Sequence, residues 1–129
     1  MNVKIDTKEK FSVITPVEHE IAANMTEVLL QILESYLKKD IPHLVLNMSE
    51  VNTLAAEAAA MIASEQQNFY EHNASFVVCE LKEETENLLD KLELLEFMNV
   101  TPTESEAWDI VQMEEIEREL LGDFDKEES

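Results

Sequence analysis

The chain has 129 residues, of which 45% are hydrophobic, and its formal net charge at pH 7 is −20. This length fits one domain that can bury a hydrophobic core without metal or disulfide cross-links. The acidity argues against binding to nucleic acid or to anionic membranes, because both are bound through clustered Lys and Arg, and Arg118 is the only arginine. The single cysteine, Cys79, cannot form an internal disulfide. No apolar segment reaches the ~18 residues of a membrane span, and the first residues lack the apolar segment of a signal peptide. We therefore expect a single-domain cytoplasmic protein.

The first forty residues predict a hairpin followed by an amphipathic helix. Residues 2–5 and 11–15 alternate in polarity and are separated by a polar stretch, as expected for two paired strands. From Ile21 to Tyr36 the apolar residues recur at helical spacing and form one stripe. The start of this helix stays open, because residues 15–18 and residues 24–27 both resemble helix caps.

The central part predicts two buried strands around a helix. Residues 43–48 and residues 75–79 are continuous apolar runs, which is typical of strands covered on both faces. The segment from about Leu54 to Glu71 lies between them and is predicted to be helical. Its alanines carry little bulk, so this helix can lie close to the sheet or to a partner.

The last third predicts a helix over 85–95, a strand over 97–100 and a long final helix. We expect the final helix to begin at residues 101–104, with Thr101 as the cap and Pro102 in the first turn. Gly122 is expected to end it, before an acidic tail. The element order is therefore ββαβαβαβα, which predicts an α/β domain with a mixed sheet of about five strands and four helices. The expected division is a domain at 1–112 and a helical extension with an acidic tail at 113–129.

The order of residues from Leu44 to Ile62, LVLNMSEVNTLAAEAAAMI, resembles the STAS domain, the fold of bacterial anti-sigma-factor antagonists. That family typically reads L-V-L-(N/D)-L-x-x-V-x-x-(hydrophobic)-D-S-S-G-L at this point. Further similarity lies in residues 76–79, 84–95 and 105–107, so the resemblance covers about residues 2–116. The segment from Met113 to Leu120 looks like an extension found on STAS proteins of Bacteroidetes-type bacteria.

The resemblance also implies a modified position. In the family, the anti-sigma factor is also a kinase and phosphorylates a serine of the D-S-S-G-L motif. In this chain the motif aligns with Ala55, Ala56, Glu57, Ala58 and Ala59. Because Ala56 and Glu57 have no hydroxyl group, neither can be phosphorylated in this way. We therefore predict a degenerate phosphorylation site within a partner-binding set of Thr53, Ala55, Ala56, Glu57 and Ala58.

Three interpretations of Glu57 stay open at the sequence level. The protein binds its partner without being switched off, or Glu57 acts as a permanent partial phosphate, or Glu57 only favours the positive end of its own helix. Phosphorylation could also have moved to a nearby hydroxyl, on Ser49, Thr53 or Ser64.

No other pattern predicts catalysis, a metal or a cofactor. The three histidines, His19, His43 and His72, lie on different predicted elements without metal-ligand spacing. Cys79 lies in an apolar strand, where a thiol is unreactive. A glycine-rich phosphate loop requires more than the one glycine of this chain. We therefore expect a protein without enzymatic activity.

The expected partner is an anti-sigma factor or a kinase-like regulator, bound through residues 48–53 and the first turns of the helix at 55–62. The alternative is a STAS subunit of a membrane transport complex, such as an ABC lipid-transport system. A third interpretation is a homodimer or scaffold formed through the last helix, where Met113, Ile116, Leu120 and Leu121 form an apolar stripe.

Overall fold

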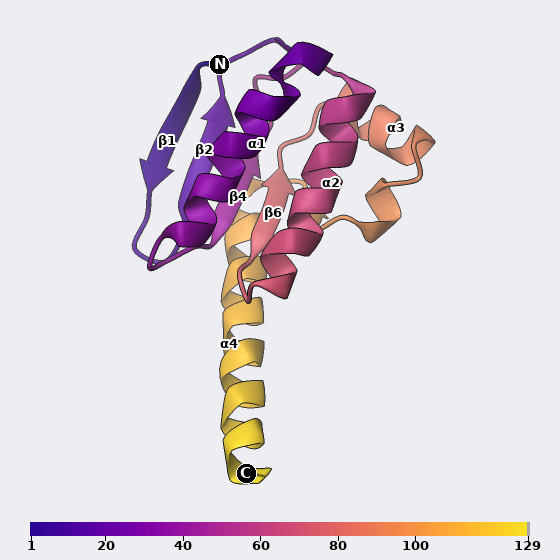
Figure 1. Cartoon of the computed structure of the whole chain (residues 1–129). Helices are drawn as coiled ribbons and strands as arrows, with labels where there is room; N and C mark the ends of the chain where they lie inside the picture. Colours follow the sequence, from indigo (N-terminus) through magenta and orange to yellow (C-terminus); the bar gives the residue numbers. More distant parts are fainter. Residues whose placement is uncertain (129) are drawn as a thin grey trace.

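The computed structural model describes the backbone of residues 1–128 and the side chains of residues 1–122. Its centre is a five-stranded mixed sheet in the order β1-β2-β4-β6-β7 (Figure 1). The strands are β1 (Val3–Thr7), β2 (Ser12–Pro16), β4 (Leu44–Asn47), β6 (Phe76–Cys79) and β7 (Val100–Thr101). Strands β1 and β2 are antiparallel, and every other neighbouring pair is parallel. The predicted fold class is confirmed.

Helices cover both faces of this sheet. Helices α1 (Thr26–Ser35) and α2 (Ala56–Glu71) lie side by side on one face, and α4 (Glu104–Glu128) crosses the other (Figure 1). Helix α3 (Glu83–Lys91) lies beyond α2. Three short 3-10 helices complete the chain, namely η1 (Ala23–Met25), η2 (Tyr36–Lys38) and η3 (Leu95–Phe97). No helix among residues 1–128 is both long enough and apolar enough to cross a membrane.

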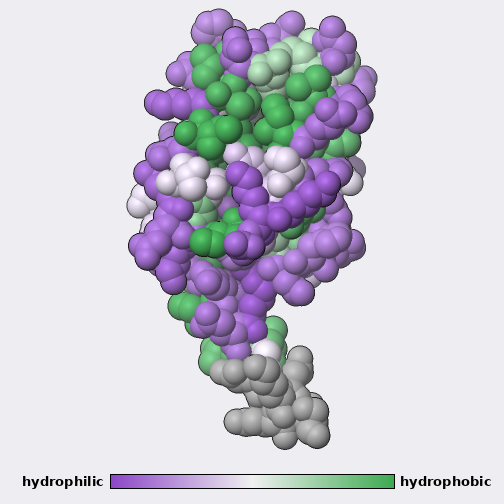
Figure 2. Space-filling model, turned by 60° about the vertical axis from the view of Figure 1, so that its left-hand side comes forward, coloured by the Kyte–Doolittle hydropathy of each residue, from purple (hydrophilic) through white to green (hydrophobic). Residues whose placement is uncertain are grey.

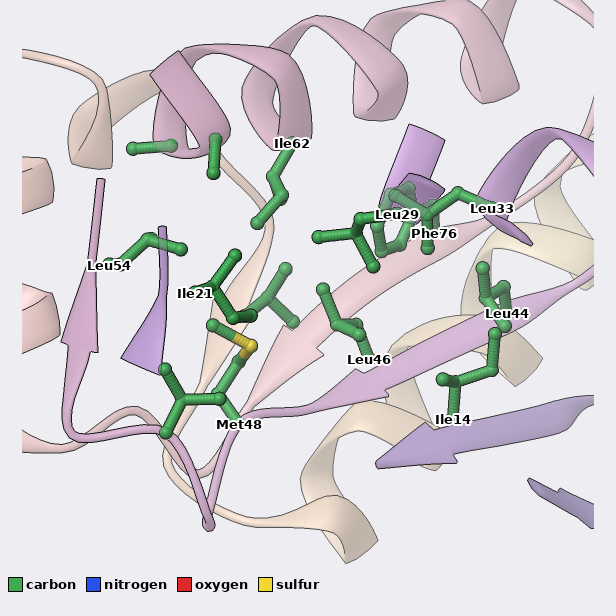
Figure 3. Close-up of a cluster of buried hydrophobic side chains, with 14 of the residues drawn as sticks. Ile14, Ile21, Leu29, Leu33, Leu44, Leu46, Met48, Leu54, Ile62 and Phe76 are labelled. Atoms are coloured by element: carbon green, nitrogen blue, oxygen red, sulfur yellow. The ribbon is translucent and has the colours of Figure 1, made fainter. Parts of the chain in front are cut away.

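Successive side chains of each strand point to opposite faces of the sheet, so the core has two layers. The larger cluster fills the space under α1 and α2, as Figure 3 shows for Ile14, Leu44, Leu46 and Phe76 of the strands, Leu29 and Leu33 of α1, and Ile62 of α2. The smaller cluster lies under α4 and contains Phe11, Val13, Val45, Val77, Cys79, Ala107 and Val111. Strands β4 and β6 are apolar throughout because each face has a helix to cover it.

A second, two-stranded sheet was not predicted. It pairs β3 (Glu20–Ile21) with β5 (Thr53–Leu54) in parallel. The prediction that a helix begins near Leu54 is wrong by two residues, because Thr53 and Leu54 are held in this ladder and α2 begins at Ala56. Helix α1 begins at Thr26, so the second of the two possible starts is the observed one.

The predicted helix at 85–95 and strand at 97–100 are also displaced. Helix α3 ends at Lys91, and Glu93 adopts a left-handed backbone conformation with φ of 60°, which a helix cannot continue through. Leu95 to Phe97 then form η3, so Phe97 is not in a strand and its side chain is 82% exposed. The last strand, β7, is therefore shorter and begins at Val100.

Two predictions about the final helix are wrong. Thr101 pairs with Cys79 in the sheet, and the cap is Thr103, whose Oγ1 accepts a hydrogen bond from the backbone N–H of Glu106 at 3.2 Å. Gly122 does not end the helix, which continues to Glu128, because Gly122 has no positive φ and no proline follows it. An interior glycine costs a helix only about 1 kcal/mol. The expected tail is therefore helical up to Glu128, and Ser129 lies outside the described residues. The expected domain boundary after residue 112 falls inside α4 and stays a prediction.

Candidate partner-binding site

The turn from Met48 to Ala55 lies at the carboxyl edge of the parallel strands. It leaves β4 at Asn47 and enters α2 at Ala56. Strands β6 and β7 end at the same edge, because parallel neighbours share their direction. Ligands and partners of α/β sheets commonly bind at this edge, where the loops and helix N-termini converge.

Backbone hydrogen bonds hold this turn in place. Asn52 and Thr53 both donate their backbone N–H to the carbonyl oxygen of His19, at 2.7 and 3.1 Å. Ala55 donates its N–H to the carbonyl oxygen of Ile21 at 2.8 Å. The Asn47 side-chain oxygen accepts the backbone N–H of Ser49 at 2.9 Å. The turn is therefore fixed to β3 on one side and to the end of β4 on the other.

The turn divides into buried and exposed positions. Met48 and Val51 are buried and anchor it to the main core. Ser49 and Thr53 are exposed, and Ser64 of α2 is exposed as well. The three hydroxyl groups considered for a relocated phosphorylation are thus accessible, and their modification stays a prediction.

The structure brings the five predicted site residues together at the N-terminus of α2. Ala55 is the N-cap residue and is half-buried, with extended φ and ψ of −67° and 147°. Ala56 and Glu57 are exposed in the first turn, whereas Ala58 is completely buried in the main core. Thr53 is exposed beside them. The surface that a partner can touch is therefore Thr53, Ala56 and Glu57, and Ala58 lies beneath it.

No side chain caps this end of α2, because the N-cap residue is an alanine. Among the described residues, the backbone N–H groups of Ala56, Glu57 and Ala58 have no hydrogen-bond acceptor. Such groups give a helix N-terminus its partial positive charge. Glu57 lies in the first turn of α2, close to these groups.

A polar network joins the turn to its neighbours at this edge, and sequence reasoning missed it. Lys82, the residue before α3, donates a hydrogen bond from Nζ to Oδ1 of Asn52 at 2.6 Å. Asn47 donates from Nδ2 to Oε1 of Glu104 at 3.0 Å, and the backbone N–H of Glu104 donates to Oε2 of Glu80 at 3.0 Å. These contacts join residues 24 to 57 positions apart, so no local sequence pattern indicates them.

Carboxylates dominate the charge around the turn. Glu50 is exposed on the turn, Glu57 is exposed in the first turn of α2, and the first turn of α3 carries Glu83, Glu84 and Glu86. A basic surface on a partner therefore complements this edge, mainly by increasing the rate of association.

The remaining candidate residues have structural positions. His43 is buried, and its Nδ1 accepts the backbone N–H of Ser75 at 3.1 Å. Burial, with the nearby Arg118 charge, lowers the pKa of His43. Cys79 is completely buried, and burial together with the carboxylates of Glu104 and Glu80 raises its thiol pKa to about 12. Among the side chains that the structure describes, no group of three or more from His, Cys, Asp or Glu could hold a metal ion.

Comparison with known proteins agrees with this architecture. A family model described as the STAS domain matches residues 2–107. The chain therefore belongs to the STAS domain family. No curated protein matches the chain.

Solved structures show the same fold at low sequence identity. An anti-sigma factor antagonist from Mycobacterium paratuberculosis has a TM-score of 0.75 and 19% identity, over 86% of this chain and 93% of that one. A serine-to-glutamate variant of RsbS from Moorella thermoacetica has a TM-score of 0.67 and 14% identity, over 87% and 96%. The murine Slc26a9 anion transporter has a TM-score of 0.64 and 14% identity, over 81% of this chain but only 18% of the transporter. The chain is thus a STAS domain similar in fold to anti-sigma factor antagonists.

Proposed function

We propose that this protein is a non-catalytic, cytoplasmic regulator that binds an anti-sigma factor or a related serine-kinase-like protein. The contact surface is the turn at 48–53 together with the first turn of α2. The observation that carries the proposal is the position of Ala56 and Glu57, which are exposed at a helix N-terminus where the family motif has serines. An exposed helix tip on a rigid turn is a surface that a partner can reach without any rearrangement of the domain.

The same two residues define how the interaction is regulated. Phosphorylation adds about −1.5 to −2 charges to a serine, and a group of this charge at the interface can separate a complex. Neither Ala56 nor Glu57 has the hydroxyl group to which a serine kinase transfers phosphate. The proposed complex is therefore not dissociated by modification of these positions. Glu57 carries less charge than a phosphate and lacks its three acceptor oxygens, which favours persistent binding over the permanently released state.

The direct experiment restores the missing hydroxyl group. Ala56→Ser and Glu57→Ser are prepared as single variants and tested for binding to the anti-sigma and kinase-fold proteins of the same organism, with and without ATP. Ala60→Ser is the matched control, because Ala60 is exposed on the same helix one turn further on. We expect the unmodified chain to bind with or without ATP. We expect a restored serine to be phosphorylated and its complex to separate.

Two results would contradict the proposal. If no protein of the anti-sigma or kinase class binds the unmodified chain, the proposed partner is wrong. If a complex forms but Ala56→Arg and Glu57→Arg bind as tightly as Ala60→Arg, the first turn of α2 is not the interface. The arginine variants test contact directly, because a long charged side chain at an exposed position blocks a close approach without disturbing the core.

The second candidate is a STAS subunit of a membrane transport complex. The similarity to part of an anion transporter supports this class, because a similar fold forms part of the transporter chain. This function predicts that the chain sediments with membranes when expressed at its natural level, and that its deletion alters lipid asymmetry. A chain that stays in the supernatant and binds a kinase-fold protein supports the first candidate instead.

A further inference from the structure

Helix α4 has an inner face that fixes it to the domain. Ala107 and Val111 are completely buried in the smaller core cluster. One turn further on, Glu114 accepts a hydrogen bond from Nδ2 of Asn99 at 3.4 Å. Arg118 donates from Nη2 to Oγ of Ser75 at 2.9 Å. The spacing of four, three and four residues places these positions on one side of the helix.

The opposite side of α4 is apolar and uncovered. Met113, Ile116 and Leu120 are 57%, 56% and 64% exposed. Their spacing of three and four residues aligns them in one stripe, roughly half a turn around the helix from the inner face. We call these three residues the outer stripe. Leu121, which was predicted to belong to the same stripe, is also exposed but lies three residues after Arg118, on the inner side of the helix. Single exposed apolar residues are ordinary, but an aligned row on a projecting helix marks a contact surface. In Figure 2 hydrophobic atoms appear among hydrophilic ones on this projecting part, just above the grey end.

A cleft continues the outer stripe towards the domain. It has a volume of about 590 Å³ and lies between the β1–β2 turn and α4, where Phe11, Trp108 and Ile116 line it. The rings of Phe11 and Trp108 stack with centroids 4.6 Å apart. Ile116 belongs to both the cleft and the outer stripe, so the two form one continuous apolar surface.

Carboxylates border this surface. Glu117 and Glu119 flank the outer stripe on its two sides. Glu9, Glu115 and Glu119 line the cleft together with Lys8 and Lys10, and Lys8 pairs with Asp6 at 2.9 Å, so carboxylates outnumber the cations at this surface. The one arginine of the helix, Arg118, is on the inner face and bonded to Ser75. A second copy of the chain would place Glu117 and Glu119 against identical carboxylates, between two molecules of net charge −20 each. Such like-charge contacts oppose association.

We propose that the outer stripe and its cleft bind an amphipathic helix of another protein whose apolar side is flanked by lysine or arginine. The apolar stripe of such a helix packs on Met113, Ile116 and Leu120, and its cations pair with Glu117 and Glu119. This helix-in-groove mode needs a row of anchors at helical spacing, which α4 presents. The inference concerns a surface separate from the α2 tip and does not depend on the proposed function.

The test uses the full chain and three labelled 18-residue peptides at physiological salt. The first peptide has a leucine stripe flanked by lysines, the second has glutamate in place of lysine, and the third has the composition of the first in an order that removes the stripe. Binding is followed by fluorescence anisotropy. We expect the first peptide to bind at least tenfold more tightly than the third, and the second not to bind.

Paired variants locate the binding surface. I116S/L120S is expected to weaken binding of the first peptide at least tenfold. The control V28S/I41S changes two apolar residues elsewhere on the surface, which are 44% and 45% exposed, and is expected to change this binding less than twofold. Because two serines could fray the projecting helix, E117Q/E119Q provides a test that keeps the stripe. It is expected to weaken binding severalfold, whereas E27Q/E34Q on α1 leaves it unchanged.

Two outcomes overturn the proposal. Equal binding of the first and third peptides, or unchanged binding to I116S/L120S, would show that only non-specific charge attraction is present. A light-scattering mass of twice 14.8 kDa that falls to 14.8 kDa in I116S/L120S would show that the occupant is a second copy of the chain. Neither outcome depends on whether Ala56 and Glu57 contact a kinase-like partner.

Discussion

Nζ of Lys82 lies 2.6 Å from Oδ1 of Asn52 and joins the residue before α3 to the turn before α2. Both side chains are exposed, so this hydrogen bond contributes little to the stability of the whole domain. Its effect is local, because the backbone N–H groups of Asn52 and Thr53 bind the carbonyl oxygen of His19 in the same turn. Lys82 thus supports the turn that presents the α2 tip.

Replacing Lys82 by methionine keeps the length of the side chain and removes its donor. We expect Lys82→Met to change the free energy of unfolding by about 0.5 kcal/mol or less. We also expect the amide protons of Asn52 and Thr53 to exchange faster, as measured by hydrogen exchange. Lys91→Met, at the last residue of α3, is the control. Unchanged exchange in Lys82→Met would show that the backbone bonds alone hold the turn.

The tight packing of α2 on the core predicts a difference between two adjacent alanines. Ala59 is completely buried, whereas Ala60 is exposed. Ala59→Leu adds three carbon atoms to a filled core and is expected to lower the free energy of unfolding by about 1–3 kcal/mol. Ala60→Leu places the same atoms in solvent and is expected to be nearly neutral. Urea denaturation of both variants measures the difference, and similar stabilities would mean that α2 can move outward.

The buried carboxyl of Glu65 predicts a pH dependence. Burial raises the pKa of this side chain. A hydrogen bond from Asn68 at 3.4 Å opposes the shift, the charge of Glu34 adds to it and His72 also opposes it. The folded chain therefore holds this proton more tightly than the unfolded chain. This group stabilises the folded chain when the pH is below its ordinary pKa of 4.5. The stabilisation is lost as the pH rises through the raised pKa of the folded chain.

The corresponding variant is Glu65→Gln, which cannot ionise. Its stability relative to the unmodified chain is expected to increase from pH 4 to 7, as measured by urea denaturation at several pH values. Glu50→Gln removes one charge from an exposed turn position and controls for the high net charge. A stability difference for Glu65→Gln that does not change with pH would show that this carboxyl has the same pKa in the folded and unfolded chains.

The environment of Cys79 predicts slow thiol chemistry. With a pKa of about 12 and no exposed surface, the thiol is almost entirely protonated and inaccessible at pH 8. We expect a disulfide reagent to label the folded chain only as fast as the chain opens, and to label it at once in 6 M guanidinium. Fast labelling under native conditions would mean that β6 is exposed by local opening.

Buried strands were the most predictable part of the fold. The apolar runs at 43–48 and 75–79 correspond to β4 and β6 within one residue at each end, because strands covered on both faces must be apolar throughout. The β3–β5 pair could not be predicted, since two-residue strands carry no periodic signal and depend on a contact between Glu20 and Thr53. Thr101 and Thr103 are both followed by a glutamate three residues later, so local sequence offers two caps. The pairing of Thr101 with Cys79 leaves Thr103 as the cap.

The candidate site was partly predictable for similar reasons. The family motif located the tip of α2, and helix formation placed Ala56 and Glu57 in its first turn. The burial of Ala58 follows from which side of α2 faces the sheet, and the Lys82 contact follows from the position of α3. Both depend on packing between distant segments, which a short motif does not contain.

Helix α4 begins beside Glu80 at one edge of the sheet and passes Ser75 at the other before it leaves the domain. The tip of α2 therefore lies at one end of the domain, and the projecting part of α4 lies at the other (Figure 1). Two proteins docked at these places would have the whole domain between them and would not compete for space. The chain can therefore bind both proteins at the same time in a ternary complex, because binding at one end leaves the other end free.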